Sequence, residues 1–156
     1  MSRADSARTL RFAVVGVGEM GKNHARCLAS MKGVDLVAVV DPDDERRTAA
    51  AATFECEPYA STSEMPPVDA AVVAAPTALH ADLGCALLER GVHCLVEKPL
   101  AHDRREAQLL VDAADSANVT LQVGHIERFN PAVRQLKEFL EGESAIVANA
   151  RRMSAF

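Results

Sequence analysis

The stretch that decides the fold is VVGVGEMGKNHA, residues 14 to 25, in which three glycines fall within six positions directly after a run of valine. A strand pattern precedes the glycines and a helical pattern follows them. In such a strand-turn-helix unit, Gly16 permits the tight turn, Gly18 lets a pyrophosphate approach the main chain, and Gly21 lets helix and strand pack closely. The stretch therefore predicts a dinucleotide-binding turn.

The same turn predicts further cofactor contacts. The amides around Glu19 and Met20 are expected to point at the phosphate, aided by the positive end of the helix. Asp41 falls 20 residues beyond the last glycine, where it can accept hydrogen bonds from the adenine ribose hydroxyls. It would repel a 2'-phosphate, because two like charges about 4 Å apart cost a few kcal/mol at an effective dielectric near 20. We expect NAD to be favoured over NADP, and Arg46 and Arg47 to soften that preference.

Apolar runs of strand length alternate with helical patterns along almost the whole chain, which is typical of a parallel sheet covered on both faces. The pattern predicts an α/β fold, a doubly wound parallel sheet of the Rossmann type, after a disordered start over residues 1–10. A stretch at 55–68 holds at most one short strand. The expected strands are 11–16, 34–41, 69–75, 92–97 and 120–124, and the expected helices include 43–54, 78–90, 103–117 and one that begins at Pro131.

Composition excludes several classes of protein. The formal net charge of -5 and the absence of a basic patch argue against a nucleic-acid partner. No run of 18 apolar residues suggests a membrane span, and no apolar leader follows the start, so we expect a cytoplasmic protein. The cysteines are scattered, which predicts free buried thiols in a reducing cytosol and no metal site; they are Cys27, Cys56, Cys85 and Cys94.

Because ligands of this architecture bind beyond the carboxyl ends of the strands, the segment APTALH after the fourth strand is a candidate for cofactor contacts. Pro76 and Thr77 end the strand, and His80 falls in the first turn of the next helix. The positive helix end disfavours an imidazolium there. A neutral His80 beside the nicotinamide ribose is one interpretation, and a histidine that only packs beside Leu79 and Leu83 is the other.

The segment VEKPL after the fifth strand places Lys98 at the mouth of the cleft, with Glu97 pointing to the opposite face. A lysine there can donate to a substrate hydroxyl oxygen and stabilise the alkoxide that develops as hydride leaves. The alternative is a solvated lysine at a strand end. Pro99 is a candidate for a cis peptide bond.

The segment GHIERFNP after the sixth strand brings His125, Arg128 and Asn130 to the same edge. These residues are candidates for a substrate pocket, or they cap the helix that Pro131 begins. His24 lies on the apolar stripe expected for the first helix, which favours a structural role.

Together, the segments VVGVGEMG, APTALH, VEKPL and GHIERFNP, in this order and spacing, resemble the amino-terminal half of the Gfo/Idh/MocA oxidoreductase family. The resemblance implies NAD(P)-dependent oxidation of a ring hydroxyl in a sugar, polyol or nucleotide sugar. It makes Lys98 the catalytic lysine, Pro99 a cis proline, and His80 and Glu97 neighbours of the nicotinamide ribose. The segment GHIERFNPAV is most similar to members that act on UDP-N-acetylglucosamine.

Members of that family continue for about as many residues again, into an open-sheet domain that carries substrate contacts, the oligomer interface and the general base. We therefore expect residues 11–142 to form the NAD-binding domain and residues 143–156 to begin a second, truncated domain. A homo-oligomer of the family type would need the missing part. The competing interpretations are a non-catalytic NAD-binding module or a subunit that acts with a partner chain, and Lys98 distinguishes them, because a cofactor sensor has no use for it.

Overall fold

The computed structural model describes residues 8–142, which fall into two compact units. The first unit ends at Gly124, and the second begins at His125. The expected start of a second domain at 143–156 and most of the expected disordered segment 1–10 lie outside the described residues.

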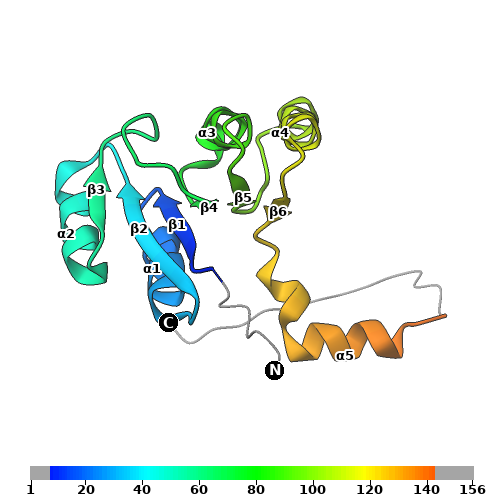
Figure 1. The fold of residues 1–156 in the computed structure, drawn as a ribbon. Coiled ribbons are helices and arrows are strands. Elements are labelled where there is room, and N and C mark those ends of the chain that lie inside the picture. Colours follow the sequence, from blue (N-terminus) through cyan, green and yellow to red (C-terminus); the bar gives the residue numbers. More distant parts are fainter. Residues whose placement is uncertain (1–7, 143–156) are drawn as a thin grey trace, which may run out of the picture. The chain divides into compact units, whose positions relative to one another are not determined.

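The first unit is a six-stranded sheet in the order β3-β2-β1-β4-β5-β6, with every neighbouring pair parallel (Figure 1). This is the strand order of a doubly wound dinucleotide-binding fold, so the predicted fold class is confirmed. The strands are β1 Leu10–Val15, β2 Val34–Val40, β3 Glu57–Tyr59, β4 Ala70–Val73, β5 His93–Val96 and β6 Leu121–Val123. The helices are α1 Glu19–Ser30, α2 Asp44–Phe54, η1 Thr77–Leu79, α3 His80–Leu88 and α4 Arg104–Ala117.

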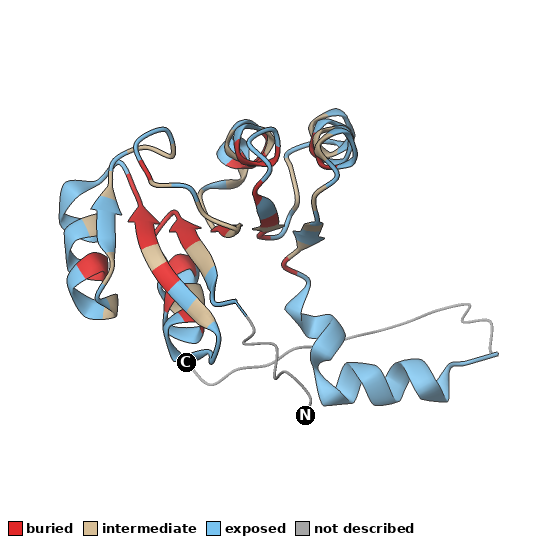
Figure 2. Ribbon diagram, viewed as in Figure 1, coloured by how far each residue is buried: buried red, intermediate tan, exposed pale blue. Residues whose placement is uncertain are grey.

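Alternate residues of the strands bury their side chains in two separate cores, one on each face of the sheet. On one face, Val14, Val39 and Val72 pack with residues of α1 and α2. On the other face, Val15 and Val73 pack with residues of α3 and α4. Figure 2 shows this burial concentrated in the central strands and in the inward faces of the helices. The core is aliphatic, as a chain with so few aromatic residues requires.

Local signals in the sequence set several helix ends. The side chain of Asp43 accepts a hydrogen bond from the amide of Arg46 at the start of α2, and Asp103 accepts one from Glu106 at the start of α4. Glu106 in turn accepts from the amide of His102, 3.1 Å away, so a variant of the capping box begins α4. These caps satisfy amides that have no partner inside the helix.

The second unit contains η2 Ile126–Phe129 and α5 Pro131–Phe139. Pro131 occupies the first turn of α5, as expected, and the side chain of Asn130 caps it by accepting from the amide of Ala132, 3.0 Å away. No residue of α5 is buried within this unit, and Figure 2 shows the helix exposed throughout.

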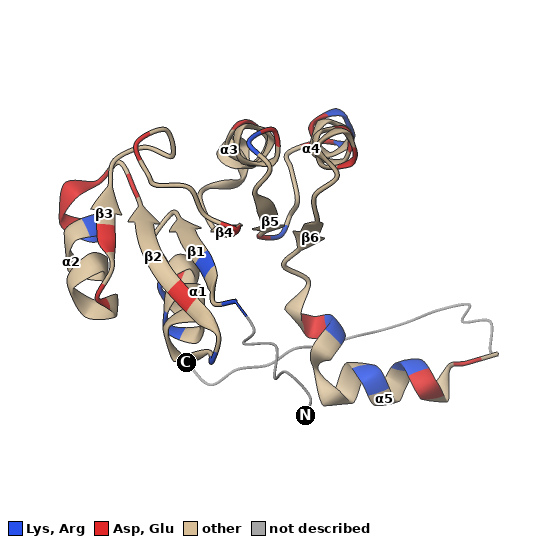
Figure 3. Ribbon diagram, viewed as in Figure 1, with Lys and Arg blue, Asp and Glu red and all other residues tan. Residues whose placement is uncertain are grey.

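Charges of both signs are mixed on the helices. Figure 3 shows Lys and Arg interspersed with Asp and Glu on α2, α4 and α5. Within the described part of the chain, no helix is both long and apolar enough to cross a membrane.

The four cysteines are free, but their exposure differs. Burial raises the pKa of Cys94 to about 12, and burial together with the charge of Glu57 raises that of Cys56 to about 11. Cys27 is exposed, so the expectation of buried thiols is wrong for this residue, which lies on the solvent side of α1. The buried thiols stay protonated near neutral pH and are unsuited to nucleophilic chemistry.

Candidate cofactor cleft and catalytic segment

The three glycines of the β1–α1 turn are required for different physical reasons. Gly16 has a φ of +87°, and a Cβ there would lie 2.7 Å from the amide nitrogen of Ala75. A Cβ on Gly21 would overlap the carbonyl oxygen of Gly16, so only glycine lets α1 approach the turn this closely. A Cβ on Gly18 would meet nothing within 4 Å. The open space at Gly18 is what a bound pyrophosphate requires, whereas the other two glycines serve the protein itself.

The amino end of α1 presents its backbone to this space. Gly18 is the N-cap and offers no side chain to the first amides of the helix. The turn is held against the end of β2, because the amide of Gly16 donates to the carbonyl oxygen of Val40 over 2.7 Å. A helix amino terminus without a capping side chain is an anion site, since its amides and dipole both favour negative charge.

Asp41 lies directly beyond β2 and is 5% exposed. Its Oδ2 accepts from the amide of Val17 over 3.0 Å, and its Oδ1 accepts from the amide of Asp43 over 3.0 Å. The carboxylate therefore ties the glycine turn to the start of α2 while one edge faces the cleft. Sequence spacing identified the position of this acid, but its second task of holding the turn is visible only in the structure.

The two arginines that follow Asp41 differ in direction. Arg46 Nη2 lies 3.3 Å from Asp41 Oδ1, and this half-exposed side chain lines the cleft. Arg47 donates to the carbonyl oxygen of Pro42 over 3.1 Å and pairs with Asp44 at the start of α2. Only Arg46 is therefore placed to reduce the repulsion between Asp41 and a 2'-phosphate.

A cleft of about 640 Å³ runs along the carboxyl ends of β1 to β4. Within it, the structure brings together six predicted cofactor residues: Gly16, Gly18, Glu19, Met20, Asp41 and Pro76. Sequence reasoning missed the segment after β3, where Ala60, Ser61 and Thr62 complete the wall. The signal available was the position of this segment at a strand end, which is where ligands of this architecture bind.

Beyond β4, Thr77 opens η1, and His80 is the first residue of α3. His80 is 1% exposed; its Nε2 lies 2.8 Å from the carbonyl oxygen of Ala75 and its Nδ1 lies 3.0 Å from that of Pro99. Carbonyl oxygens only accept, so both contacts are hydrogen bonds only when both ring nitrogens carry a proton. His80 joins the segments after β4 and β5, and a direct cofactor contact remains a prediction.

Beyond β5, Lys98 is exposed and Glu97 is 5% exposed. The Lys98–Pro99 peptide bond is cis, as the resemblance implied. The Oε1 of Glu97 lies 2.8 Å from His24 Nε2, and its Oε2 accepts from the amide of Lys98 over 3.0 Å. Because β5 lies beside β4 in a parallel sheet, Lys98 emerges at the same edge as the cleft.

The three residues proposed from GHIERFNP lie in the second unit. Asn130 uses its side-chain oxygen to cap α5 and its Nδ2 to donate to Glu127, 2.8 Å away. His125 precedes η2, and Arg128 lies within it. The capping interpretation therefore accounts for Asn130, while substrate contacts by these residues remain predictions.

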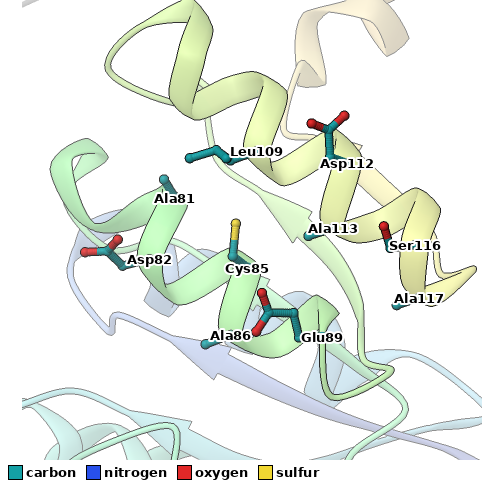
Figure 4. A pocket seen from close by; sticks show the side chains of 10 residues that line it. All are labelled: Ala81, Asp82, Cys85, Ala86, Glu89, Leu109, Asp112, Ala113, Ser116 and Ala117. Carbon is teal, nitrogen blue, oxygen red and sulfur yellow. The ribbon is translucent and has the colours of Figure 1, made fainter.

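A second hollow, about 740 Å³, lies between α3 and α4 and is larger than the cofactor cleft (Figure 4). Its lining comes from α3, the residue that follows it, and α4, and it includes the carboxylates of Asp82, Glu89 and Asp112. Burial, with Glu89 and Asp82 nearby, raises the pKa of the Cys85 thiol in this hollow. Three acids would repel a pyrophosphate, so its size does not make it a cofactor site.

Asp41 leads to a prediction about cofactor preference. Asp41→Asn is expected to raise the affinity for NADPH relative to NADH by about tenfold or more, because the charge that repels a 2'-phosphate is removed. It should also lower the free energy of unfolding by about 1 to 3 kcal/mol, since the amide leaves one buried donor unmatched. Fluorescence titrations with both cofactors and urea unfolding measure the two effects.

The matched control is Asp44→Asn, which removes the same charge from a side chain that is 83% exposed. It should leave the cofactor preference unchanged and lower the free energy of unfolding by less than about 1 kcal/mol, since it loses only an exposed ion pair with Arg47 at the start of α2. An unaltered NADPH to NADH ratio in Asp41→Asn would remove the assigned role of this acid in cofactor choice.

A doubly wound sheet with a bare glycine turn, an acid after β2 and an open cleft at the strand ends defines a dinucleotide-binding domain. Residues 10–125 match the family model described as oxidoreductase family, NAD-binding Rossmann fold. The chain belongs to this family, the Gfo/Idh/MocA oxidoreductases, and carries its NAD-binding domain.

Curated relatives agree with this assignment. The chain is 35% identical over 130 residues to UDP-N-acetylglucosamine 3-dehydrogenase of Acidithiobacillus ferrooxidans, covering 83% of this chain and 41% of the relative. It is 42% identical over 141 residues to inositol 2-dehydrogenase 4 of Saccharopolyspora erythraea, covering 86% of this chain and 42% of the relative. The chain thus spans well under half the length of these relatives.

Solved structures give the same picture. The WlbA dehydrogenase of Bordetella pertussis, in complex with NADH and UDP-GlcNAcA, superimposes with a TM-score of 0.82 at 32% identity over 86% of this chain and 42% of that chain. UDP-N-acetylglucosamine 3-dehydrogenase GnnA of Acidithiobacillus ferrooxidans superimposes with a TM-score of 0.78 at 34% identity, over 83% of this chain and 41% of that chain. The similarity covers less than half of each of these solved chains.

Proposed function

We propose that this chain is the cofactor-binding half of an NAD-dependent dehydrogenase that oxidises a ring hydroxyl of a sugar or nucleotide sugar. The observation that carries the proposal is the placement of Lys98 beyond β5, at the same sheet edge as the glycine turn and Asp41. A cofactor store or sensor needs the turn and the acid. It does not need an exposed cation at the edge where hydride would be transferred.

The residues present fit NAD. The amino end of α1 at Gly18 would hold the pyrophosphate, and Asp41 would accept from the adenine ribose hydroxyls. When bound, the nicotinamide supplies the hydride acceptor. Asp41 would repel a 2'-phosphate, so NAD would be preferred over NADP, and Arg46, 3.3 Å from Asp41 Oδ1, would moderate this preference.

The catalytic step assigned to this chain is electrostatic. The Lys98 ammonium donates to the substrate hydroxyl oxygen and stabilises the negative charge that develops there as hydride leaves carbon. The proton of that hydroxyl goes to a general base, which we place in the part of the relatives' length that this chain does not span. A general base of this kind contributes about 10²- to 10⁴-fold to the rate.

For the substrate we propose a nucleotide sugar. Support comes from the names of two relatives, one a UDP-N-acetylglucosamine dehydrogenase and the other a dehydrogenase in complex with UDP-GlcNAcA. His125, Arg128 and Asn130 are the proposed substrate-side residues in the described chain. The four free cysteines support work in a reducing compartment, which we take to be the cytoplasm.

Formation of NADH by the purified chain tests this function. The chain is incubated with NAD and, in separate reactions, UDP-N-acetylglucosamine, UDP-N-acetylglucosaminuronic acid and myo-inositol, and NADH is followed by absorbance over hours. We expect slow NADH formation with a nucleotide sugar that exceeds the rate of a Lys98→Met variant. NADH binding without any NADH formation above that variant would overturn the dehydrogenase assignment and leave an NAD-binding module.

A further inference from the structure

A buried pair of side chains connects the phosphate-binding helix to the segment that carries Lys98. His24 Nε2 on α1 lies 2.8 Å from Oε1 of Glu97, a residue 73 positions away at the end of β5. The two side chains are 17% and 7% exposed. Because a carboxylate only accepts hydrogen bonds, the N–H of this contact is on His24 Nε2, which donates a hydrogen bond to Glu97.

The other oxygen of the Glu97 carboxylate is also occupied. Its Oε2 accepts from the amide of Lys98 over 3.0 Å, so a single carboxylate holds α1 on one side and the Lys98 peptide on the other. Two hydrogen bonds to the same carboxylate therefore connect α1 to the Lys98 peptide. Loss of either donor leaves a buried carboxylate oxygen without a partner.

The position of Gly124 confines this carboxylate further. A Cβ on Gly124 would lie 3.0 Å from both Cδ and Oε1 of Glu97, which is tighter than ordinary contact. The main chain at Gly124, directly after β6, thus lies close to the Oε1 side of this carboxylate. Glu97 has room for its observed position, and its two hydrogen bonds keep it there.

His24 lies in α1 shortly after Gly18 and Glu19, where the cofactor phosphate is expected. A helix is stiff over so short a distance, being only about 1.5 Å long per residue. The His24–Glu97 pair consequently sets the Lys98 peptide relative to the same helix that receives the pyrophosphate. The expected phosphate site and the Lys98 peptide are therefore both positioned by α1.

We propose that His24 is a positioning residue for Lys98, acting through the carboxylate of Glu97. The functional value of this role rests on the proposed dehydrogenase function, in which Lys98 stabilises the reacting oxygen. The structural part does not depend on turnover, since it concerns the hydrogen bond from the Lys98 amide to Glu97.

The test is amide hydrogen exchange of the full chain followed by NMR, comparing the Lys98 amide with the buried β4 amide of Val72. In His24→Phe, the Lys98 amide is expected to exchange at least about tenfold faster relative to Val72, because Glu97 no longer stays in place. His24→Gln, whose side-chain amide can still donate to Glu97, should remain within about threefold of the wild type. The matched control Arg26→Phe, at an exposed position of the same helix, should show no selective change.

Two results would overturn the proposal. One is a Lys98 amide in His24→Phe that accelerates by the same factor as Val72, which would mean that His24 only supports the fold. The other is His24→Gln behaving like His24→Phe. Should His24→Phe fail to fold, His24→Leu is measured in its place, because leucine likewise has no donor for Glu97 and should release the Lys98 amide.

A kinetic readout separates this proposal from the function on which it rests. Where NADH formation is measurable, His24→Phe should lower kcat while the Kd for NADH stays within about twofold, the split expected for a misplaced catalytic group. If no NADH forms with any substrate, the dehydrogenase assignment fails while the exchange measurement still decides the link between His24 and Lys98.

Discussion

Gly21→Ala is expected to prevent stable folding of the first unit. The added Cβ would overlap the carbonyl oxygen of Gly16, which belongs to the backbone and cannot rotate away. Gly16 has a φ of +87° and lies close to the backbone of Ala75, so the turn cannot shift to make room for the added methyl group. Helix α1 would have to move off the sheet, at a cost of about 3 kcal/mol or more. Urea unfolding followed by circular dichroism measures this loss.

Gly18→Ala is the matched control, since it adds the same methyl group three residues earlier. Its Cβ meets nothing within 4 Å and its φ of -66° suits alanine, so the free energy of unfolding should stay within about 0.5 kcal/mol of the wild type. A Gly21→Ala variant as stable as the wild type would contradict the close approach of α1 to the turn.

Lys98→Met is expected to abolish measurable hydride transfer while leaving the Kd for NADH within about twofold. Methionine keeps most of the length of the side chain and removes the charge, so the loss reports the ammonium alone. Removing one donor to a developing oxyanion lowers kcat by about 10²- to 10³-fold. The slow reaction of this chain then falls below detection. NADH absorbance and NADH fluorescence measure the two quantities on the same preparation.

The control is Lys32→Met, an exposed lysine just before β2, at the end of that strand opposite the cleft. This variant should retain wild-type turnover. Equal NADH formation by Lys98→Met and wild type would contradict the catalytic role of Lys98, and the interpretation as a non-catalytic NAD-binding module would then be favoured.

Much of the fold was predictable because its signals are local. The run of valine followed by closely spaced glycines predicts a strand and a turn. The positive φ of Gly16 is the conformation that such a turn needs. Asp103 and Glu106 have the spacing of a capping box, and in the structure the Asp103 side chain caps the start of α4 by accepting from the amide of Glu106. The cofactor residues that line the cleft follow from the same logic, since strand ends in a parallel sheet share an edge.

The buried face of α1 was harder to predict. Hydrophobicity alone favours a stripe through Met20 and Met31, but both are exposed, at 38% and 53%. The buried residues are Gly21, Ala25 and Leu28. Helix α1 lies so close to the turn that small side chains face the sheet. Met20, turned outward, lines the cofactor cleft.

The role of His24 was not predictable from local patterns. Its partner Glu97 lies 73 residues away, and a histidine among apolar residues resembles one that simply packs in the core. Helix and strand periodicities place residues on faces, but they do not say which two faces meet. The same limit applies to His80, whose backbone partners after β4 and β5 become adjacent only when the sheet assembles.

Titration of NADH against the purified chain tests whether NAD binds at the glycine turn. We expect a saturable change in NADH fluorescence below millimolar cofactor, and in Gly18→Ala a Kd raised at least about tenfold, or about 1.4 kcal/mol, with the fold intact. A folded wild-type chain that gives no change at millimolar NADH, or a Gly18→Ala variant that binds as tightly as the wild type, would contradict it.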